Sequence, residues 1–146
     1  HTVQHILDTG GRILLTGDIT GGGLGTPDVE TALAAQLNGA IDVLKVAHHG
    51  SRSSTSNALV GTARPRVSII SAGTDNAHCH PTAEVLDRIA ATGDVYSTGS
   101  GIGSASGGCR ATRWPPGANT GCGTISLRTH RGKQLALRCG ANERVY

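Results

Sequence analysis

The chain is poor in aromatic residues, has no methionine and contains no long apolar run. Its 146 residues include one Trp and two Tyr, too few rings for the stacking platform on which single-strand binders hold bases, so any nucleic acid would be held by its phosphates. There is no run of 18 apolar residues and no basic-then-apolar leader, so we expect no membrane span and no uncleaved signal peptide in this segment. Because the sequence lacks Met and starts at His1, we expect part of the translated protein to precede it.

The four cysteines lack the Cys-x-x-Cys spacing of a structural zinc ribbon. Cys109 and Cys122 bracket a Gly/Pro-rich stretch that can bury little core, and a disulfide across such a loop is physically sensible. We therefore predict a Cys109–Cys122 disulfide, which leaves Cys79 to pair with Cys139. The alternative is four reduced thiols in a cytosolic protein. Disulfides instead indicate a secreted, extracellular protein or an outward-facing domain of a membrane protein.

The formal charge of +3 is modest but unevenly distributed. Arg12 and Lys45 are the only basic residues among the first fifty, which are net acidic, and the other eleven of the thirteen Lys and Arg residues follow from Arg52 onward. This asymmetry suits an anionic partner, although a mildly basic, solvated surface is also ordinary.

Strand and helix patterns alternate along the chain, which predicts a single layered α/β domain over residues 1–146. Strands are expected at 3–8, 12–16, 41–47, 67–71, 95–97, 124–129 and 134–138. Helices are expected from 26 to 37 after a Gly-rich loop, from 55 or 56 to 61, and over 83–91. The first two strands form a hairpin that turns at Gly10 and Gly11, and the last two form a hairpin that turns at 130–133.

Two apolar strands end in side chains of the kind that bind metals. Leu-Leu-Thr-Gly-Asp ends at Asp18, and Leu-Lys-Val-Ala-His-His-Gly-Ser contains His48 directly after its strand. A carboxylate and an imidazole at neighbouring strand ends are what a divalent metal site requires, because strands are rigid and the loops after them are open to substrate. His49 is the second choice for the imidazole, and Gly17 permits the sharp turn that presents Asp18.

Taken in order with two further strings, these strands resemble a known family. Ile-Ile-Ser-Ala-Gly-Thr-Asp-Asn-Ala-His-Cys-His-Pro (69–81) and Val-Tyr-Ser-Thr (95–98) follow them. The set resembles the metallo-β-lactamase superfamily, and within it the C-terminal hydrolase domain of ComEC-type DNA-internalisation competence proteins. The similarity extends from Gln4 to Ser97 and resumes over 123–137.

The resemblance implies an αββα sandwich with two divalent metal ions at one edge of its sheets. The metal is expected to be zinc, with manganese as the alternative. Asp18 would bridge the two ions, and His48 or His49 would bind one of them. Two metals acidify a shared water and neutralise charge on a phosphoryl oxygen. The implied activity is a nuclease or phosphodiesterase acting on DNA or another phosphoester. The alternatives are a hydrolase of another ester or lactone, and a non-catalytic, processed half-domain that binds a partner chain or an anionic polymer.

Further candidates lie in the loops that follow the strands. In the family that the chain resembles, the loop with Asn76 and His80 faces the cleft, so we expect both to contact substrate. His80 would act there as an acid or hydrogen-bond donor, unless it only caps the following helix. Ser51 and Arg52, at the start of a Ser-rich stretch, can cradle a phosphate or cap a helix.

The sequence also departs from the family pattern. The His-x-His-x-Asp-His loop that supplies most metal ligands is absent. The chain therefore resembles only the C-terminal half of the fold, and the N-terminal half is expected from another segment of the protein or from another chain. A Gly/Pro-rich, Cys-bounded insertion over about 99–122 is a second departure.

Overall fold

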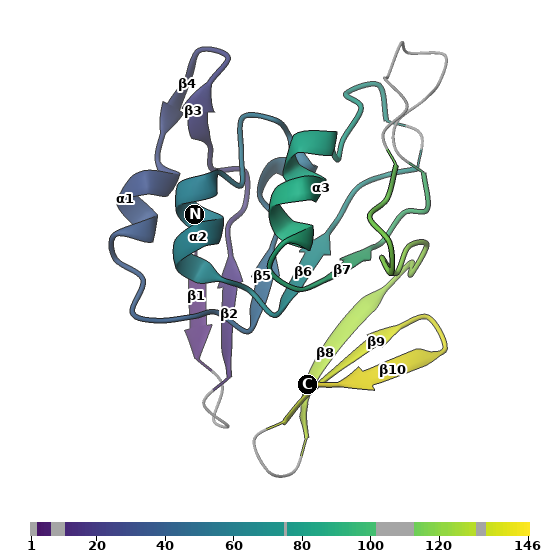
Figure 1. Cartoon of the computed structure of the whole chain (residues 1–146). Coiled ribbons are helices and arrows are strands. Elements are labelled where there is room, and N and C mark those ends of the chain that lie inside the picture. Colours follow the sequence, from purple (N-terminus) through teal and green to yellow (C-terminus); the bar gives the residue numbers. More distant parts are fainter. Residues whose placement is uncertain (1–2, 7–10, 75, 102–112, 131–133) are drawn as a thin grey trace.

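A five-stranded, largely parallel sheet forms the centre of the computed structural model, which describes residues 3–6, 11–74, 76–101, 113–130 and 134–146. Its strands are β1 (Val3–Ile6), β2 (Arg12–Leu15), β5 (Val43–Lys45), β6 (Val67–Ile70) and β7 (Asp94–Ser97), in the order β1-β2-β5-β6-β7. β1 is antiparallel to β2, and the other neighbours are parallel. The parallel strands therefore all end at the same edge of the sheet (Figure 1).

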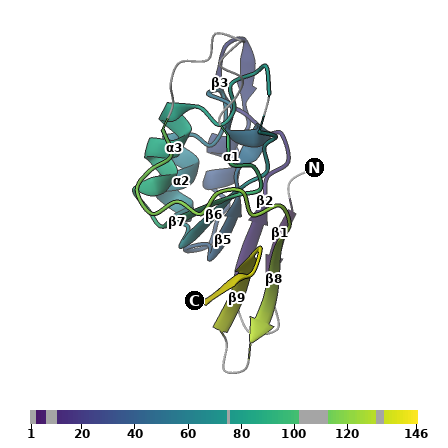
Figure 2. The same ribbon diagram turned by 90° about the vertical axis from the view of Figure 1, so that its right-hand side faces the viewer.

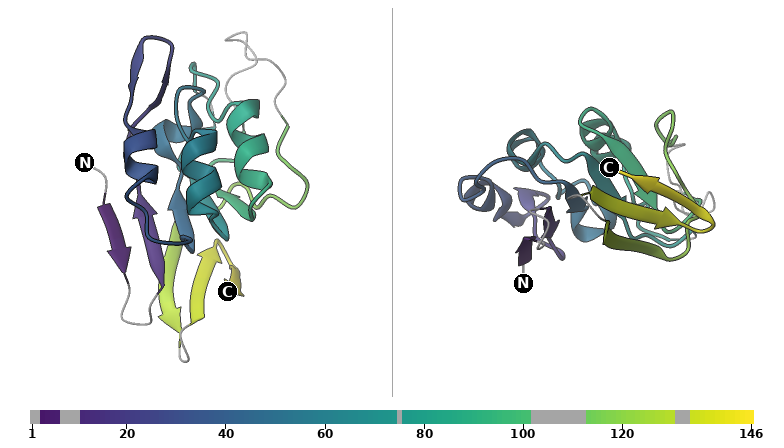
Figure 3. Two further views of the ribbon diagram at one scale, coloured as in Figure 1. Left: turned by 60° about the vertical axis from the view of Figure 1, so that its left-hand side comes forward. Right: turned by 90° about the horizontal axis from the view of Figure 1, so that it is seen from below.

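Three short helices cover one face of this sheet (Figure 3). They are α1 (Glu30–Ala34), α2 (Asn57–Ala63) and α3 (Ala83–Ala90), one in each connection between parallel strands. Leu14 and Leu44 pack on this side against α1 and α2, and Ile70 packs on it against α3. The burial of Val85, Leu86 and Ile89 on α3 confirms the predicted apolar face of that helix.

A second sheet packs against the opposite face. It contains β8 (Ile125–His130), β9 (Gln134–Cys139) and β10 (Asn142–Val145), all antiparallel, in the order β10-β9-β8. Leu135 and Leu137 pack on Val43, Val67 and Tyr96 of the first sheet. The layers are thus helices, sheet, sheet, and the second sheet lies at the opposite end of the molecule from the strand β3 (Gly21–Gly23) (Figure 2).

The predicted α/β class and the antiparallel pairing of both predicted hairpins are confirmed, whereas residues 7–10 and 131–133 of their turns lie outside the described residues. One predicted helix is wrong. Residues 21–28 form a small antiparallel ribbon of β3 and β4 (Thr26–Asp28), and α1 begins only at Glu30 and ends at Ala34. Pairing with β3 holds 26–28 extended, and Asp28 instead accepts hydrogen bonds from the backbone N–H and hydroxyl of Thr31. Strand β10 was not predicted. The metallo-β-lactamase assignment of this layered fold stays a prediction.

The predicted disulfide pairing is wrong, because Cys122 is bonded to Cys139. Cys139 pairs in register with Ile125, so Cys122 lies three residues before its cross-strand partner, and the two Cα atoms are 4.6 Å apart. Cys79 is also disulfide-bonded, and Cys109 lies outside the described residues.

The end of the predicted insertion over 99–122 lies along β7, at the edge of the main sheet. Asn119 forms a parallel bridge with Tyr96 of β7, whereas 102–112 lie outside the described residues. In the described part of the chain, no helix has the length and apolar character needed to cross a membrane.

Candidate functional site

The loops that follow β2 and β5 meet at the edge where the parallel strands end. The backbone N–H of His48 donates to the carbonyl of Gly17 over 3.0 Å, which places the loop of Asp18 beside the turn of His48. Gly17 has a φ of 59°, the left-handed conformation expected for a sharp turn before Asp18. Asp18 itself is exposed. The structure therefore brings the predicted carboxylate and imidazole loops together.

His48 and His49 occupy an unusual turn. Both have positive φ angles, 46° and 56°, a backbone conformation that residues other than glycine seldom adopt. Two buried hydroxyls hold the residue before them: Thr55 Oγ1 accepts from the backbone N–H of Ala47 (3.1 Å), and Ser54 Oγ donates to its carbonyl (2.8 Å). Because such conformations persist only where the surroundings impose them, the turn is a rigid support for two imidazoles.

The two imidazoles differ in their surroundings. Nδ1 of His48 is buried and has no hydrogen-bond partner among the residues that the structure describes. Nδ1 of His49 lies 2.5 Å from the carbonyl oxygen of Ser71, which can only accept, so His49 carries a proton on Nδ1. Burying a ring nitrogen without a hydrogen-bond partner costs free energy. His48 is therefore the better candidate of the two for binding a further group, such as a metal ion.

His80 joins this cluster from the loop after β6. Its ring centroid lies 5.7 Å from that of His48 and 5.7 Å from that of His78. Burial lowers the pKa of His80, and the neighbouring His48, His78 and His49 lower it further. The ring is therefore neutral at pH 7.

Asn76 braces the His80 loop. Its Nδ2 donates to the carbonyls of Gly73 (2.9 Å) and His80 (2.8 Å), and its Oδ1 accepts from the backbone N–H of His80 (2.8 Å). These three hydrogen bonds give the amide a structural role in the loop, and its predicted contact with substrate stays a prediction. The next peptide bond, His80–Pro81, is cis, and Gly50 packs directly against Pro81.

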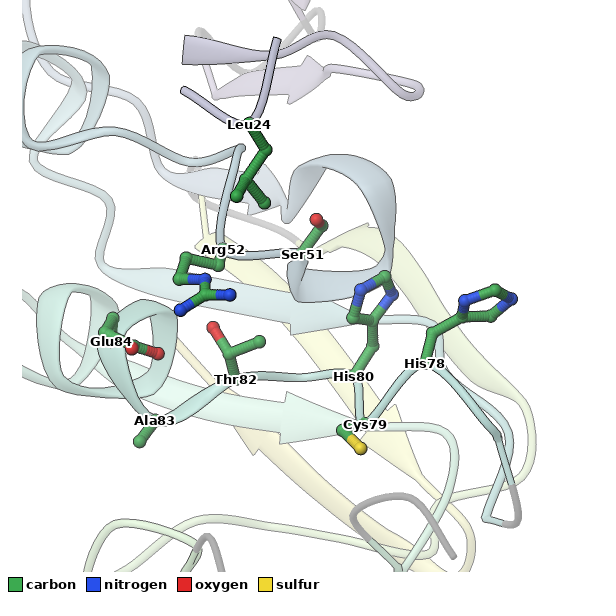
Figure 4. Close-up of a pocket in the computed structure, with 9 residues that line it drawn as sticks. All are labelled: Leu24, Ser51, Arg52, His78, Cys79, His80, Thr82, Ala83 and Glu84. Atoms are coloured by element: carbon green, nitrogen blue, oxygen red, sulfur yellow. The ribbon is translucent and has the colours of Figure 1, made fainter. Parts of the chain in front are cut away.

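The predicted substrate residues Ser51 and Arg52 line a pocket of about 410 Å³ that also contains His78 and His80. Ser51 is buried, and its Oγ lies 3.1 Å from Oγ of Ser53. Figure 4 shows the Arg52 side chain reaching into this pocket toward Thr82 and Glu84. A smaller hollow of about 210 Å³ shares His78 and His80 and extends to His49 and Asn76. The histidines thus lie between two hollows.

Lys45 lies near Asp18 and is not among the residues predicted from the sequence. The Lys45 side chain is half-buried and donates to the carbonyl of Val46 over 2.9 Å. Burial lowers the pKa of Lys45, and the charge of Asp18 opposes that shift. Its position in an apolar strand, three residues before His48, was the only signal in the sequence.

The donor set tests whether these residues fit a metal. Asp18 and His48 carry donor atoms of the right kind, and Nδ1 of His48 lacks a partner in the described residues. Within the described ranges, however, no group of three or more His, Cys, Asp and Glu side chains is arranged to hold an ion. The described side chains alone therefore do not form a closed metal centre.

The chain is similar in sequence to parts of longer known proteins. No protein-family model and no solved structure matches it. It is 38% identical over 90 residues to Recombination protein 2 of Haemophilus influenzae, 38% over 84 residues to ComE operon protein 3 of Bacillus subtilis, and 32% over 93 residues to Competence protein ComA of Neisseria gonorrhoeae. These matches cover 57–62% of this chain but only 10–13% of the relatives. The chain is thus similar to one segment of proteins named for competence and recombination.

Proposed function

We propose that the chain is the C-terminal half of a metallo-β-lactamase-type hydrolase that cleaves phosphodiester bonds in DNA. The observation that carries the proposal is the junction of two strand-end loops, in which the hydrogen bond from His48 to Gly17 places an imidazole turn beside Asp18. The similar proteins are named for competence and recombination, which favours DNA as the substrate over another phosphoester, ester or lactone.

Asp18 and His48 would supply part of the ligand set for two divalent ions, zinc or manganese. When bound, such ions lower the pKa of a shared water and neutralise charge on the phosphoryl oxygens. The remaining ligands would come from an N-terminal half, carried by a preceding segment or another chain. The chain spans only about a tenth of the relatives that it matches, which leaves room for such a segment in proteins of this kind.

His80 would serve as a hydrogen-bond donor to the substrate. The pKa of a general acid should lie near the working pH, whereas burial and His48 lower the pKa of His80. A neutral imidazole still has one N–H to donate. We therefore assign His80 the stabilisation of a phosphoryl or leaving-group oxygen, in preference to proton donation.

The disulfide supports an extracellular or outward-facing location. Cys122 and Cys139 are bonded, and disulfides form and persist chiefly in oxidising compartments. We propose that the chain works outside the cytosol, where it would meet DNA from the surroundings.

Complementation tests the proposed function. The chain is joined to the segment that precedes the matched region in the Bacillus subtilis relative, supplied with zinc or manganese, and assayed on labelled DNA. We expect hydrolysis that is lost on Asp18→Ala and on His48→Ala and is retained in Asp87→Ala, which removes an exposed carboxylate from α3. Hydrolysis that is unaffected by both site variants would refute the assignment. DNA binding without hydrolysis would favour the non-catalytic alternative.

A further inference from the structure

A third hollow, of about 220 Å³, adjoins the histidine pocket and shares Arg52 with it. Its lining is polar and includes Gly22, Arg52, Ser53, Ser56, Asn57 and Arg88. Because neighbouring hollows share lining residues, the three hollows lie side by side, from His49 and His80, past Arg52, to Arg88.

Arg88 is fixed at the wall of this hollow. It extends from α3, is half-buried, and its Nη1 donates to the carbonyls of Ser54 (3.1 Å) and Thr55 (3.0 Å). A guanidinium has five N–H donors, so this anchor leaves donors for a ligand. Holding the group in place beforehand reduces the entropy lost on binding.

The charge of the hollow favours an anion. Two guanidinium groups line it and no carboxylate does, within the part of the chain that the structure describes. Glu30 is fully buried, and its carboxylate accepts the backbone N–H groups of Thr55 and Ser56. Glu84 lines the neighbouring histidine pocket, and its charge interacts with both Arg52 and Arg88 without lining this hollow. Neutral donors on Ser53 and Asn57 complete a lining that suits phosphate oxygens.

We propose that this hollow is a second phosphate subsite, in which Arg52 and Arg88 hold a phosphate of the same nucleic-acid strand whose neighbouring phosphodiester lies at the histidines. The proposal rests on the proposed function, because it takes the strand to be bound across Asp18 and His48. It narrows the substrate class to a polynucleotide that engages two phosphates, since a small phosphoester would leave this hollow unused.

Binding without hydrolysis tests the subsite. Fluorescence anisotropy of a labelled oligothymidylate is measured with the chain in chelator at several salt concentrations, with a thymidine mononucleotide as competitor. We expect Arg52→Gln and Arg88→Gln each to weaken binding about tenfold. Each should also reduce the slope of log K against log[salt] by about 0.7 for the lost phosphate contact. Arg64→Gln is the matched control, because it removes an exposed charge at the far end of α2 and should change neither quantity.

Controls for folding separate a lost phosphate contact from a destabilised chain. Because Arg88 anchors backbone carbonyls, Arg88→Lys is included, and binding is compared only for variants whose unfolding transition matches that of the parent chain. Arg52 is exposed, so its variant should fold normally. Wild-type affinity and salt slope in Arg52→Gln, or a mononucleotide that competes as well as an oligonucleotide, would overturn the subsite. If the complemented protein does not hydrolyse DNA but the chain still binds the oligonucleotide through Arg52, the proposed function is refuted and the phosphate subsite stands.

Discussion

Glu30 offers a sharp test of how the site is held. Its side chain is fully buried in α1, and its two carboxylate oxygens accept from the backbone N–H groups of Thr55 (2.6 Å) and Ser56 (2.5 Å). Thr55 in turn accepts from Ala47, the residue before His48. The perturbation is Glu30→Gln, which preserves shape but replaces one oxygen by an NH₂ group that faces a backbone donor.

The magnitude follows from these two hydrogen bonds. A hydrogen bond to a charged group is worth about 1.5–3 kcal/mol, and an unsatisfied buried N–H costs about 1–3 kcal/mol. Glu30→Gln should therefore lower the free energy of unfolding by about 3 kcal/mol. Glu30→Ala loses both acceptors and leaves a cavity, so it should lower the free energy by about 5 kcal/mol.

Urea unfolding followed by circular dichroism measures these differences, provided that the m-value is unchanged. Glu84→Gln, the same chemical change at an exposed position in the first turn of α3, should cost no more than about 1 kcal/mol. A second measurement is the NMR spectrum of the imidazoles, in which Glu30→Gln should shift the signals of His48. A loss of less than about 0.5 kcal/mol for Glu30→Gln, with unchanged His48 signals, would refute the reasoning.

Two further predictions concern Gly50 and His80. Gly50→Ala should destabilise the chain by about 3 kcal/mol or more, because the new Cβ would lie 2.6 Å from Cβ of Pro81 at a φ of +85°; Gly25→Ala, at a φ of +77° in open space, should cost only about 1 kcal/mol in the same denaturation assay. The lowered pKa of His80 means that the unfolded chain binds more protons just below the ordinary value of 6.5. The stability contribution of neutral His80 is therefore complete above pH 6.5 and declines as pH falls through the folded pKa. His80→Gln should flatten this part of the stability profile, and an unchanged slope below pH 6.5 would contradict the assignment.

Local patterns were enough to predict the frame of the fold. The apolar strands before Asp18 and His48 and the apolar face of α3 follow from hydrophobic period alone, because burial imposes that period on each element. Ser56 was one of two candidate caps for α2, and its hydroxyl accepts from the N–H of Leu59. The meeting of the loops that carry Asp18 and His48 then follows from parallel strands that end at one edge.

The features that were predicted wrongly or not at all depend on contacts between segments that are distant in the sequence. Residues 26–28 have the Pro and acidic residues of a helix start, yet pairing with β3 decides their conformation. Cys122 meets Cys139 because of the β8–β9 register, which local composition does not reveal. Arg88 reaches carbonyls 33 and 34 residues away, so its place in the wall of the third hollow requires the packing of α3.

The two halves of the proposed ligand pair differ in what holds them. The turn of His48 is fixed by buried contacts of Ala47 with Ser54 and Thr55, and through Thr55 by Glu30. These contacts all lie within this chain, so the backbone that carries the imidazole needs no other segment to hold it. Asp18, by contrast, is exposed on its loop, with the half-buried Lys45 as its electrostatic neighbour. If an N-terminal half completes a metal centre here, its effect on backbone geometry should therefore be larger at the exposed loop of Asp18 than at the turn of His48, which buried contacts already hold.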